Sequence, residues 1–269
     1  MSGFVLREFI YLDRQKVEDF LSSIEGGIAQ EVKERSKTHK GKAQAKLSAK
    51  VVEVGTGGGF KEIEQEELKK TTDASLFQRL YDYLEKGEMI KQVSQELGAG
   101  EELKPGQLLE IDGELEFSNL EKLIDTIDSF AQFMEIFGQK LDAEADEAIK
   151  GFKLLGSKSA AKGLTIKISI QGSSYKFVAT LPTEKLKVTK GEVEGRFKVL
   201  CRVSKVLGQN ETLDLFSLLP SGIKLNRSQM KDFLKAFKDM PPILGERITE
   251  EDLRIKYPAA EITPIAIYR

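Results

Sequence analysis

The stretch LTIKISIQGSSYKFVATL, residues 164–181, predicts a β-hairpin. Its two arms, Leu164–Gln171 and Tyr175–Leu181, are rich in β-branched, aliphatic and aromatic residues, and they flank the turn signal Gly172-Ser173-Ser174. The chain is therefore expected to be β-rich from here on, with further strands after the hairpin.

The sequence after this hairpin supplies such strands. Arg196–Leu207 predicts one long strand, and Ile262–Tyr268 predicts another, which we place near a sheet edge because Pro264 cannot donate to a strand ladder. A helix is expected after Asn226. The sequence therefore predicts a β-rich C-terminal part over residues 164–269 with one helix.

The N-terminal part begins with a predicted strand, Phe4–Leu12. Asp13 then occupies a helix N-cap position, where its side chain can accept free backbone N–H groups. Apolar residues follow at helical spacing, and Gly26-Gly27 is expected to end this helix in the left-handed conformation. The segment predicts a strand, a capped helix and a stop.

Two more helices and an acidic strand are expected before residue 150. Asp73 is predicted to cap a helix that ends at Gly87, and Ser118 to cap a second, longer helix. Between them, Leu109–Phe117 alternates apolar residues with Glu110, Asp112, Glu114 and Glu116, which predicts a half-buried strand with a solvated acidic face at an edge.

These elements predict an α+β fold with mixed or antiparallel sheets and packed helices. We expect an N-terminal α/β part over residues 1–150 and a C-terminal part over residues 164–269, joined by a linker or loop at residues 151–163. The linker is rich in Gly, Ser, Ala and Lys.

Residues 28–72 form a charged excursion. Its first half is basic, its second half contains Glu62, Glu64, Glu66 and Glu67, and a glycine tract separates them. Small apolar residues alternate with polar ones from Ala43 to Val51, so we expect either a hairpin or a flexible segment. The candidate interaction residues here are Lys33, Arg35, Lys37, Lys40, Lys42, Lys46, Lys50, Gly57, Gly58 and Gly59.

This excursion leaves alternatives open. The lysines could bind phosphates of nucleic acid or anionic lipid, although the basic run lacks stacking aromatics. A membrane-active β-hairpin is a third reading, opposed by the acidic second arm. The glycine tract does not fit a phosphate-binding loop, because Phe60-Lys61-Glu62 follows Gly59 where Gly-Lys-Ser/Thr is required.

Reactive side chains are scarce, with one histidine, one cysteine and no tryptophan in 269 residues. His39 lies among lysines with no second metal ligand nearby, and Cys201 shares an apolar strand face, so it is expected in the core. We therefore expect no catalytic residues, cofactor or metal, while a site assembled from dispersed carboxylates stays open.

Composition bounds the setting. Hydrophobic residues make up 40% of the chain, enough for a core, and the net charge is only −2, so an electrostatic partner must be met by a local patch. No apolar run approaches the roughly 18 residues that span a bilayer, and no signal peptide is evident. These features predict a cytoplasmic protein.

Three motifs resemble a prokaryotic family that carries a domain of unknown function. They are Arg7–Gly27, with Arg7-Glu8-Phe9-Ile10-Tyr11-Leu12-Asp13 at its start, Ser75–Tyr81, and Tyr257–Arg269. The resemblance implies similarity to the small component of the two-gene Dodola anti-phage system, whose larger partner resembles a ClpB-type AAA+ ATPase. It brings no catalytic residues.

We therefore expect a non-enzymatic sensor, adaptor or regulatory subunit in anti-phage defence. The expected partner is an AAA+ ATPase, with self-association as a second candidate and with nucleic acid or anionic membrane under the alternative reading. The contact segment is expected within residues 28–72.

Overall fold

The computed structural model describes residues 7–38, 72–94, 102–136, 163–218, 249 and 251–269. The chain forms two compact units. One is Asp13–Met89, and the other combines the residues before Asp13 with those from Ile90 onward. The α+β class with a strand-rich C-terminal half is confirmed.

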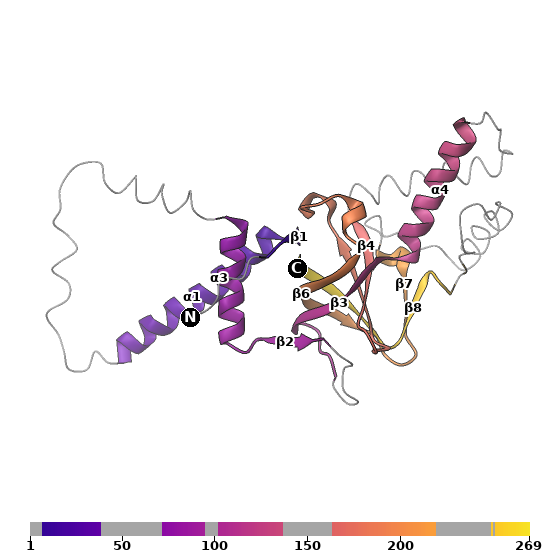
Figure 1. The fold of residues 1–269 in the computed structure, drawn as a ribbon. Coiled ribbons are helices and arrows are strands. Elements are labelled where there is room, and N and C mark those ends of the chain that lie inside the picture. Colours follow the sequence, from indigo (N-terminus) through magenta and orange to yellow (C-terminus); the bar gives the residue numbers. More distant parts are fainter. Residues whose placement is uncertain (1–6, 39–71, 95–101, 137–162, 219–248, 250) are drawn as a thin grey trace, which may run out of the picture. The chain divides into compact units, whose positions relative to one another are not determined.

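The larger unit is built on a seven-stranded sheet that closes on itself (Figure 1). Five strands form the ring, in the order β3, β4, β5, β9, β6 and back to β3. The strands of the sheet are β1 (Phe9–Leu12), β2 (Ile90–Val93), β3 (Leu108–Phe117), β4 (Leu164–Ser169), β5 (Lys176–Leu181), β6 (Gly195–Val206) and β9 (Ala259–Tyr268).

The ring has the connectivity of an OB-fold barrel. Counted along the chain, its strands lie in the order 1-2-3-5-4 before returning to 1, and the third and fifth, β5 and β9, are parallel. The other four pairings are antiparallel. Closure removes free edges from the ring, and β1 and β2 join it from outside through β9 and β3.

Alternating apolar residues fill the barrel. Ile111, Ile166, Phe177, Val199 and Ile262, one from each ring strand, all lie in the same buried cluster. The period of two residues places every second side chain on the inner face, so each strand contributes to one shared core. The predicted hairpin is confirmed as β4 and β5, and Gly172 at its turn has the positive φ of 79° that favours glycine.

Short elements extend the barrel between its ring strands. Helix α4 (Asn119–Ile136) lies in the connection from β3 to β4. The connection from β6 to β9 contains a second, two-stranded sheet and a 3-10 turn, and two further 3-10 turns follow β5. These elements are β7 (Thr212–Asp214), β8 (Arg254–Lys256), η3 (Leu215–Leu218), η1 (Thr183–Lys185) and η2 (Lys190–Glu192).

The smaller unit contains helices α1 (Arg14–Thr38) and α3 (Asp73–Lys86). The expected stop at Gly26-Gly27 is wrong, because α1 continues to Thr38. A glycine inside a helix costs about 1 kcal/mol but ends the helix only if it turns left-handed, and Gly26 is not among the glycines with positive φ. Residues 28–38 of the expected charged excursion are helical, and the rest of it, residues 39–71, lies outside the described residues.

Three further predictions are corrected by the contacts in the structure. Thr72, not Asp73, caps α3, because its Oγ1 accepts the Ser75 N–H at 3.2 Å. Strand β9 is interior rather than at an edge, and Pro264 is accommodated where the register with β6 shifts, opposite Cys201. Strand β3 likewise pairs with three strands and is no edge.

Strands from both sides of residues 151–163 pair in the same barrel, β3 with β4 and with β6. Of the expected linker only Gly163 lies within the described residues, and it is buried. The helix expected after Asn226 lies outside them. None of the described helices is both long and apolar enough to cross a membrane.

Candidate functional site

The candidate interaction residues divide between helix α1 and the part of the chain outside the description. Lys33, Arg35 and Lys37 lie on α1, in the half that follows Gly26-Gly27. Positions 33 and 37 are four residues apart and are therefore neighbours on a helix. The remaining candidates lie outside the described residues, as does His39: Lys40, Lys42, Lys46, Lys50, Gly57, Gly58 and Gly59.

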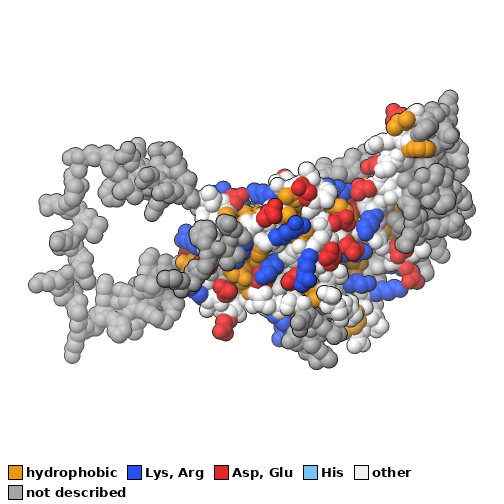
Figure 2. Space-filling view, viewed as in Figure 1, with side chains coloured by type: hydrophobic (Ala, Val, Ile, Leu, Met, Phe, Trp, Pro, Cys, Tyr) orange, Lys and Arg blue, Asp and Glu red, His pale blue; other side chains and the backbone are white. Residues whose placement is uncertain are grey.

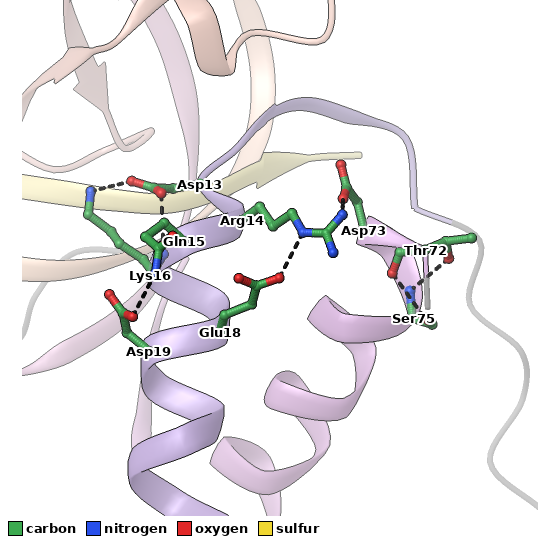
Figure 3. Close-up of polar contacts among 9 residues, drawn as sticks. All are labelled: Asp13, Arg14, Gln15, Lys16, Glu18, Asp19, Thr72, Asp73 and Ser75. Carbon is green, nitrogen blue, oxygen red and sulfur yellow. Dashed lines mark hydrogen bonds and ion pairs between the residues drawn. The ribbon is translucent and has the colours of Figure 1, made fainter. Parts of the chain in front are cut away.

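The start of α1 is fixed by Asp13, as predicted. Its Oδ1 accepts the Lys16 N–H at 3.3 Å, and its backbone carbonyl accepts the Val17 N–H at 3.1 Å. The Asp13 side chain is fully buried and its Oδ2 lies 2.9 Å from the Lys16 Nζ (Figure 3). A buried carboxylate at a helix N-terminus is stabilised by the free N–H groups and by the helix dipole.

Polar contacts join α1 to α3. Arg14 donates through Nε to Glu18 at 2.8 Å and through Nη1 to Asp73 at 3.2 Å, so it connects the first turns of both helices (Figure 3). Further along, Arg79 pairs with Glu25. From the first of these contacts to the second, the residue numbers rise along both helices. The helices α1 and α3 therefore run in the same direction.

Apolar packing completes this helix pair. Val17 and Leu21 of α1 are buried, as are Phe77, Leu80 and Leu84 of α3. Their spacing of three or four residues gives each helix one apolar face. The first half of α1 is therefore a packed base for the half that carries Lys33, Arg35 and Lys37.

Glu110 is one of two buried glutamates among the described residues of the barrel unit. Although it was expected on a solvated face, it is only 2% exposed. Tyr268 donates its hydroxyl to one carboxylate oxygen at 2.5 Å, and the Gln92 amide donates to the other at 2.5 Å. Lys198 Nζ lies 3.9 Å away. Glu110 thus ties β3 to β2, β6 and β9.

Glu121, the second buried glutamate, ties α4 to the barrel. Its backbone N–H donates to Ser118 Oγ at 3.2 Å, and its carboxylate accepts the Thr165 N–H of β4 at 3.0 Å. Lys190 Nζ lies 3.6 Å from the same carboxylate and donates to Asp125 at 2.6 Å. Burial raises the pKa of Glu121, while the bond from Thr165 and the charge of Lys190 oppose that rise.

Both glutamates serve as hydrogen-bond acceptors between elements, which is a structural use of a carboxylate. The described part of the chain contains no group of three side chains suited to hold a metal ion. Cys201 is buried on β6 as predicted, and burial raises the pKa of its thiol, so the reactive thiolate is disfavoured.

Comparison of the sequence with protein-family models identifies the family of this chain. A family model described as Domain of unknown function (DUF6414) matches residues 6–268. The chain belongs to the DUF6414 family. No curated protein matches this DUF6414 chain, and neither does any solved structure.

Sequence reasoning missed the two buried glutamates of the DUF6414 barrel. In the sequence, Ser118 and Glu121 have the spacing of a capping box, which predicts that the Glu121 carboxylate is hydrogen-bonded near the start of the helix. In the structure the Ser118 N–H instead donates to the Thr165 carbonyl at 2.9 Å, and Glu121 accepts from Thr165 in return. Glu110 gave no such signal, because its partners come from strands distant in sequence.

Proposed function

We propose that this DUF6414 chain is a non-enzymatic adaptor or regulatory subunit in prokaryotic anti-phage defence, and that it acts with a ClpB-like AAA+ ATPase. The resemblance of its N-terminal, central and C-terminal motifs supports the choice of partner. The contact segment in this proposal is the second half of α1, where Lys33, Arg35 and Lys37 lie, together with the charged residues that follow.

The observation that carries the proposal is the continuity of α1. The helix runs 25 residues from its packed base into the basic sequence. A helix that is anchored at one end presents its charges in a fixed order, so less conformational entropy is lost on binding than for a disordered arm. An acidic surface on the ATPase would complement these charges.

The test is co-purification of the tagged chain with a ClpB-like AAA+ ATPase from the same organism. We expect a complex with the native chain and loss of that complex for Lys33→Glu/Arg35→Glu/Lys37→Glu. A matched control reverses three exposed charges of the barrel, Lys187→Glu/Arg202→Glu/Lys205→Glu, and should retain binding. Absence of a complex with the native chain, or equal binding by both variants, would overturn the proposal.

The alternative is a phosphate-directed binder that uses the Lys33–Lys50 segment on nucleic acid or anionic lipid. Lys33 and Lys37 are helix neighbours, which favours this reading because adjacent cations can contact one phosphate backbone. Such binding falls steeply with salt. If the α1 variant loses oligonucleotide or vesicle binding but keeps the ATPase, the alternative replaces the adaptor proposal.

A further inference from the structure

Lys167 of β4 has surroundings that differ from those of an ordinary surface cation. Figure 2 shows Lys and Arg side chains interspersed with Asp and Glu over the described surface in view. Lys167 is half-buried instead, and its Nζ donates to a neutral acceptor, Asn119 Oδ1 of α4, at 3.2 Å. No carboxylate among the described residues forms an ion pair with it. An ammonium withdrawn from water without a counter-ion is costly, so this position favours the neutral amine.

The register of the β4–β5 hairpin places a second lysine on the same face of the sheet. Lys167 is opposite Val178 of β5. Lys176 lies two residues before Val178, so its side chain points to the same side as that of Lys167. Diagonal neighbours of this kind have Cβ atoms about 7–8 Å apart, within reach of long side chains. Lys176 is exposed.

Helix α4 brings a third lysine to Lys167 from another direction. Lys122 is exposed and lies three residues after Asn119, the hydrogen-bond partner of Lys167. Residues at this spacing are neighbours on a helix surface, with Cβ atoms about 5–6 Å apart. Two cations therefore lie near Lys167, and each of them further disfavours its ammonium form.

Acidic residues near Lys167 oppose this effect without pairing with it. Glu116 of β3 is opposite Lys167 in the antiparallel register and is exposed. Burial has the largest effect and lowers the pKa of Lys167, and the charge of Glu116 comes next and raises it. Smaller effects come from Lys122 and Lys176, which lower the pKa, and from Asp252, which raises it. The balance is a lowered pKa, so more of this amine is neutral near pH 7 than of an ordinary lysine.

We propose that Lys167 is a modification site that reacts with carbon dioxide to form a carbamate. The neutral Nζ attacks the carbon of carbon dioxide, an N–C bond forms as one C=O π bond opens, and the nitrogen releases a proton to water. The product is an anion, R–NH–COO⁻, and it lies near the positive charges of Lys122 and Lys176. The step needs no further reactant.

The chemistry of the position favours this reagent. Carbon dioxide reacts with an amine only in its unprotonated form, which the burial of Lys167 favours, and nearby cations stabilise the anionic product. The reagent is small and uncharged, so the reaction does not require an open groove on the barrel. The side chain changes from a cation to an anion on reaction, so carbon dioxide controls a charge at the contact of α4 with β4.

The test is chemical trapping of the carbamate in the full chain. The native protein is equilibrated with isotopically labelled bicarbonate and carbon dioxide at about pH 8, where an ordinary lysine with a pKa near 10.4 stays protonated. Trimethyloxonium then converts carbamates to stable methyl esters, and peptide mass spectrometry locates them. We expect trapping at Lys167 and much less at Lys205 and Lys256, which are exposed and paired with Glu211 and Glu251.

Charge variants give effects of opposite sign. Lys122→Gln/Lys176→Gln removes the cations that favour the neutral amine and stabilise the product. The trapped fraction should then fall by about threefold or more, as expected for unit charges roughly 7 Å apart in a high dielectric. Glu116→Gln removes a charge that favours the ammonium and repels the carbamate, so the fraction should rise. Arg202→Gln, on β6, is the matched control and should leave the fraction unchanged.

The opposite signs separate this chemistry from a loss of structure, because an unfolded variant would not gain carbamate at one lysine. Circular dichroism melting checks that each variant is folded. Absence of a trapped carbamate at Lys167, equal trapping at Lys205 and Lys256, or a fall rather than a rise with Glu116→Gln would overturn the proposal.

Discussion

The barrel unit and the helix pair are stabilised in different ways. In the barrel, each ring strand contributes apolar residues to one closed interior, and even its two buried glutamates are hydrogen-bonded between elements. In the helix pair, a single apolar face per helix is supplemented by exposed ion pairs and N-caps. This difference predicts that the same kind of substitution should lower the free energy of unfolding by different amounts in the two units.

The largest effect is expected in the barrel interior. Phe177 is fully buried and its ring centroid lies 5.2 Å from that of Tyr175. Phe177→Ala removes this packing and leaves a cavity, so the free energy of unfolding should fall by about 3–5 kcal/mol. Urea unfolding followed by far-UV circular dichroism measures the loss; a change as small as that of a surface substitution would contradict the shared core.

A second barrel prediction concerns Glu121. Glu121→Ala leaves the buried Thr165 N–H without its acceptor, which should cost about 1–3 kcal/mol of unfolding free energy. Hydrogen exchange should show faster exchange at Thr165. Asp125→Ala is the matched control, because it removes an exposed carboxylate that also binds Lys190; equal exchange in the two variants would contradict the contact.

The same residue predicts a pH dependence. Because burial raises the pKa of Glu121 above its ordinary 4.5, the folded state binds this proton more tightly than the unfolded state does. This contribution to stability is fully present below pH 4.5 and is lost as pH rises through the raised pKa. The stability advantage of native over Glu121→Gln should therefore shrink with rising pH across that window, measured by urea unfolding.

In the helix pair, the cap at Thr72 should matter less. Thr72→Ala removes the acceptor of the Ser75 N–H and should destabilise α3 by about 1 kcal/mol. Thr72→Asp should preserve stability, because aspartate also caps helices. Hydrogen exchange at the first turn of α3 reports the change, and no difference between the two variants would show that the cap is dispensable.

The smallest effect is expected at Arg14. Its contacts with Glu18 and Asp73 are exposed, so Arg14→Gln should shift the melting temperature only slightly. At about 1 M salt, where the screening length is roughly 3 Å, the difference should vanish. A shift that persists at high salt would show that Arg14 acts through packing.

The sequence predicted those features of the fold that depend on residues close together along the chain. The hairpin of β4 and β5, the inward face of β6 with Cys201, and the caps at Asp13 and Ser118 depend on residues a few positions apart, and all are confirmed. Closure of the barrel was not predictable in this way, because it depends on pairing β9 with β5 and β6. The bond from Tyr268 of β9 to the buried Glu110 and the interior place in the sheet of β9, which carries Pro264, follow from that pairing.

The candidate site was predictable only as a run of charge. Composition marked Lys33, Arg35 and Lys37, but not that a helix continues through Gly26-Gly27 to reach them, since glycine disfavours a helix without forbidding it.

The place of β9 in the barrel also fixes an order of events during synthesis. Its residues pair with β1, where Phe9 is opposite Tyr268, and with β5 and β6. The ring cannot close before Ala259–Tyr268 has left the ribosome. Until then, the edges of β5 and β6 that pair with β9 have no partner strand. Long-range pairing of this kind slows folding and exposes the nascent chain to aggregation. We therefore expect the yield of folded protein to depend on chaperones that hold the nascent chain until this strand is made.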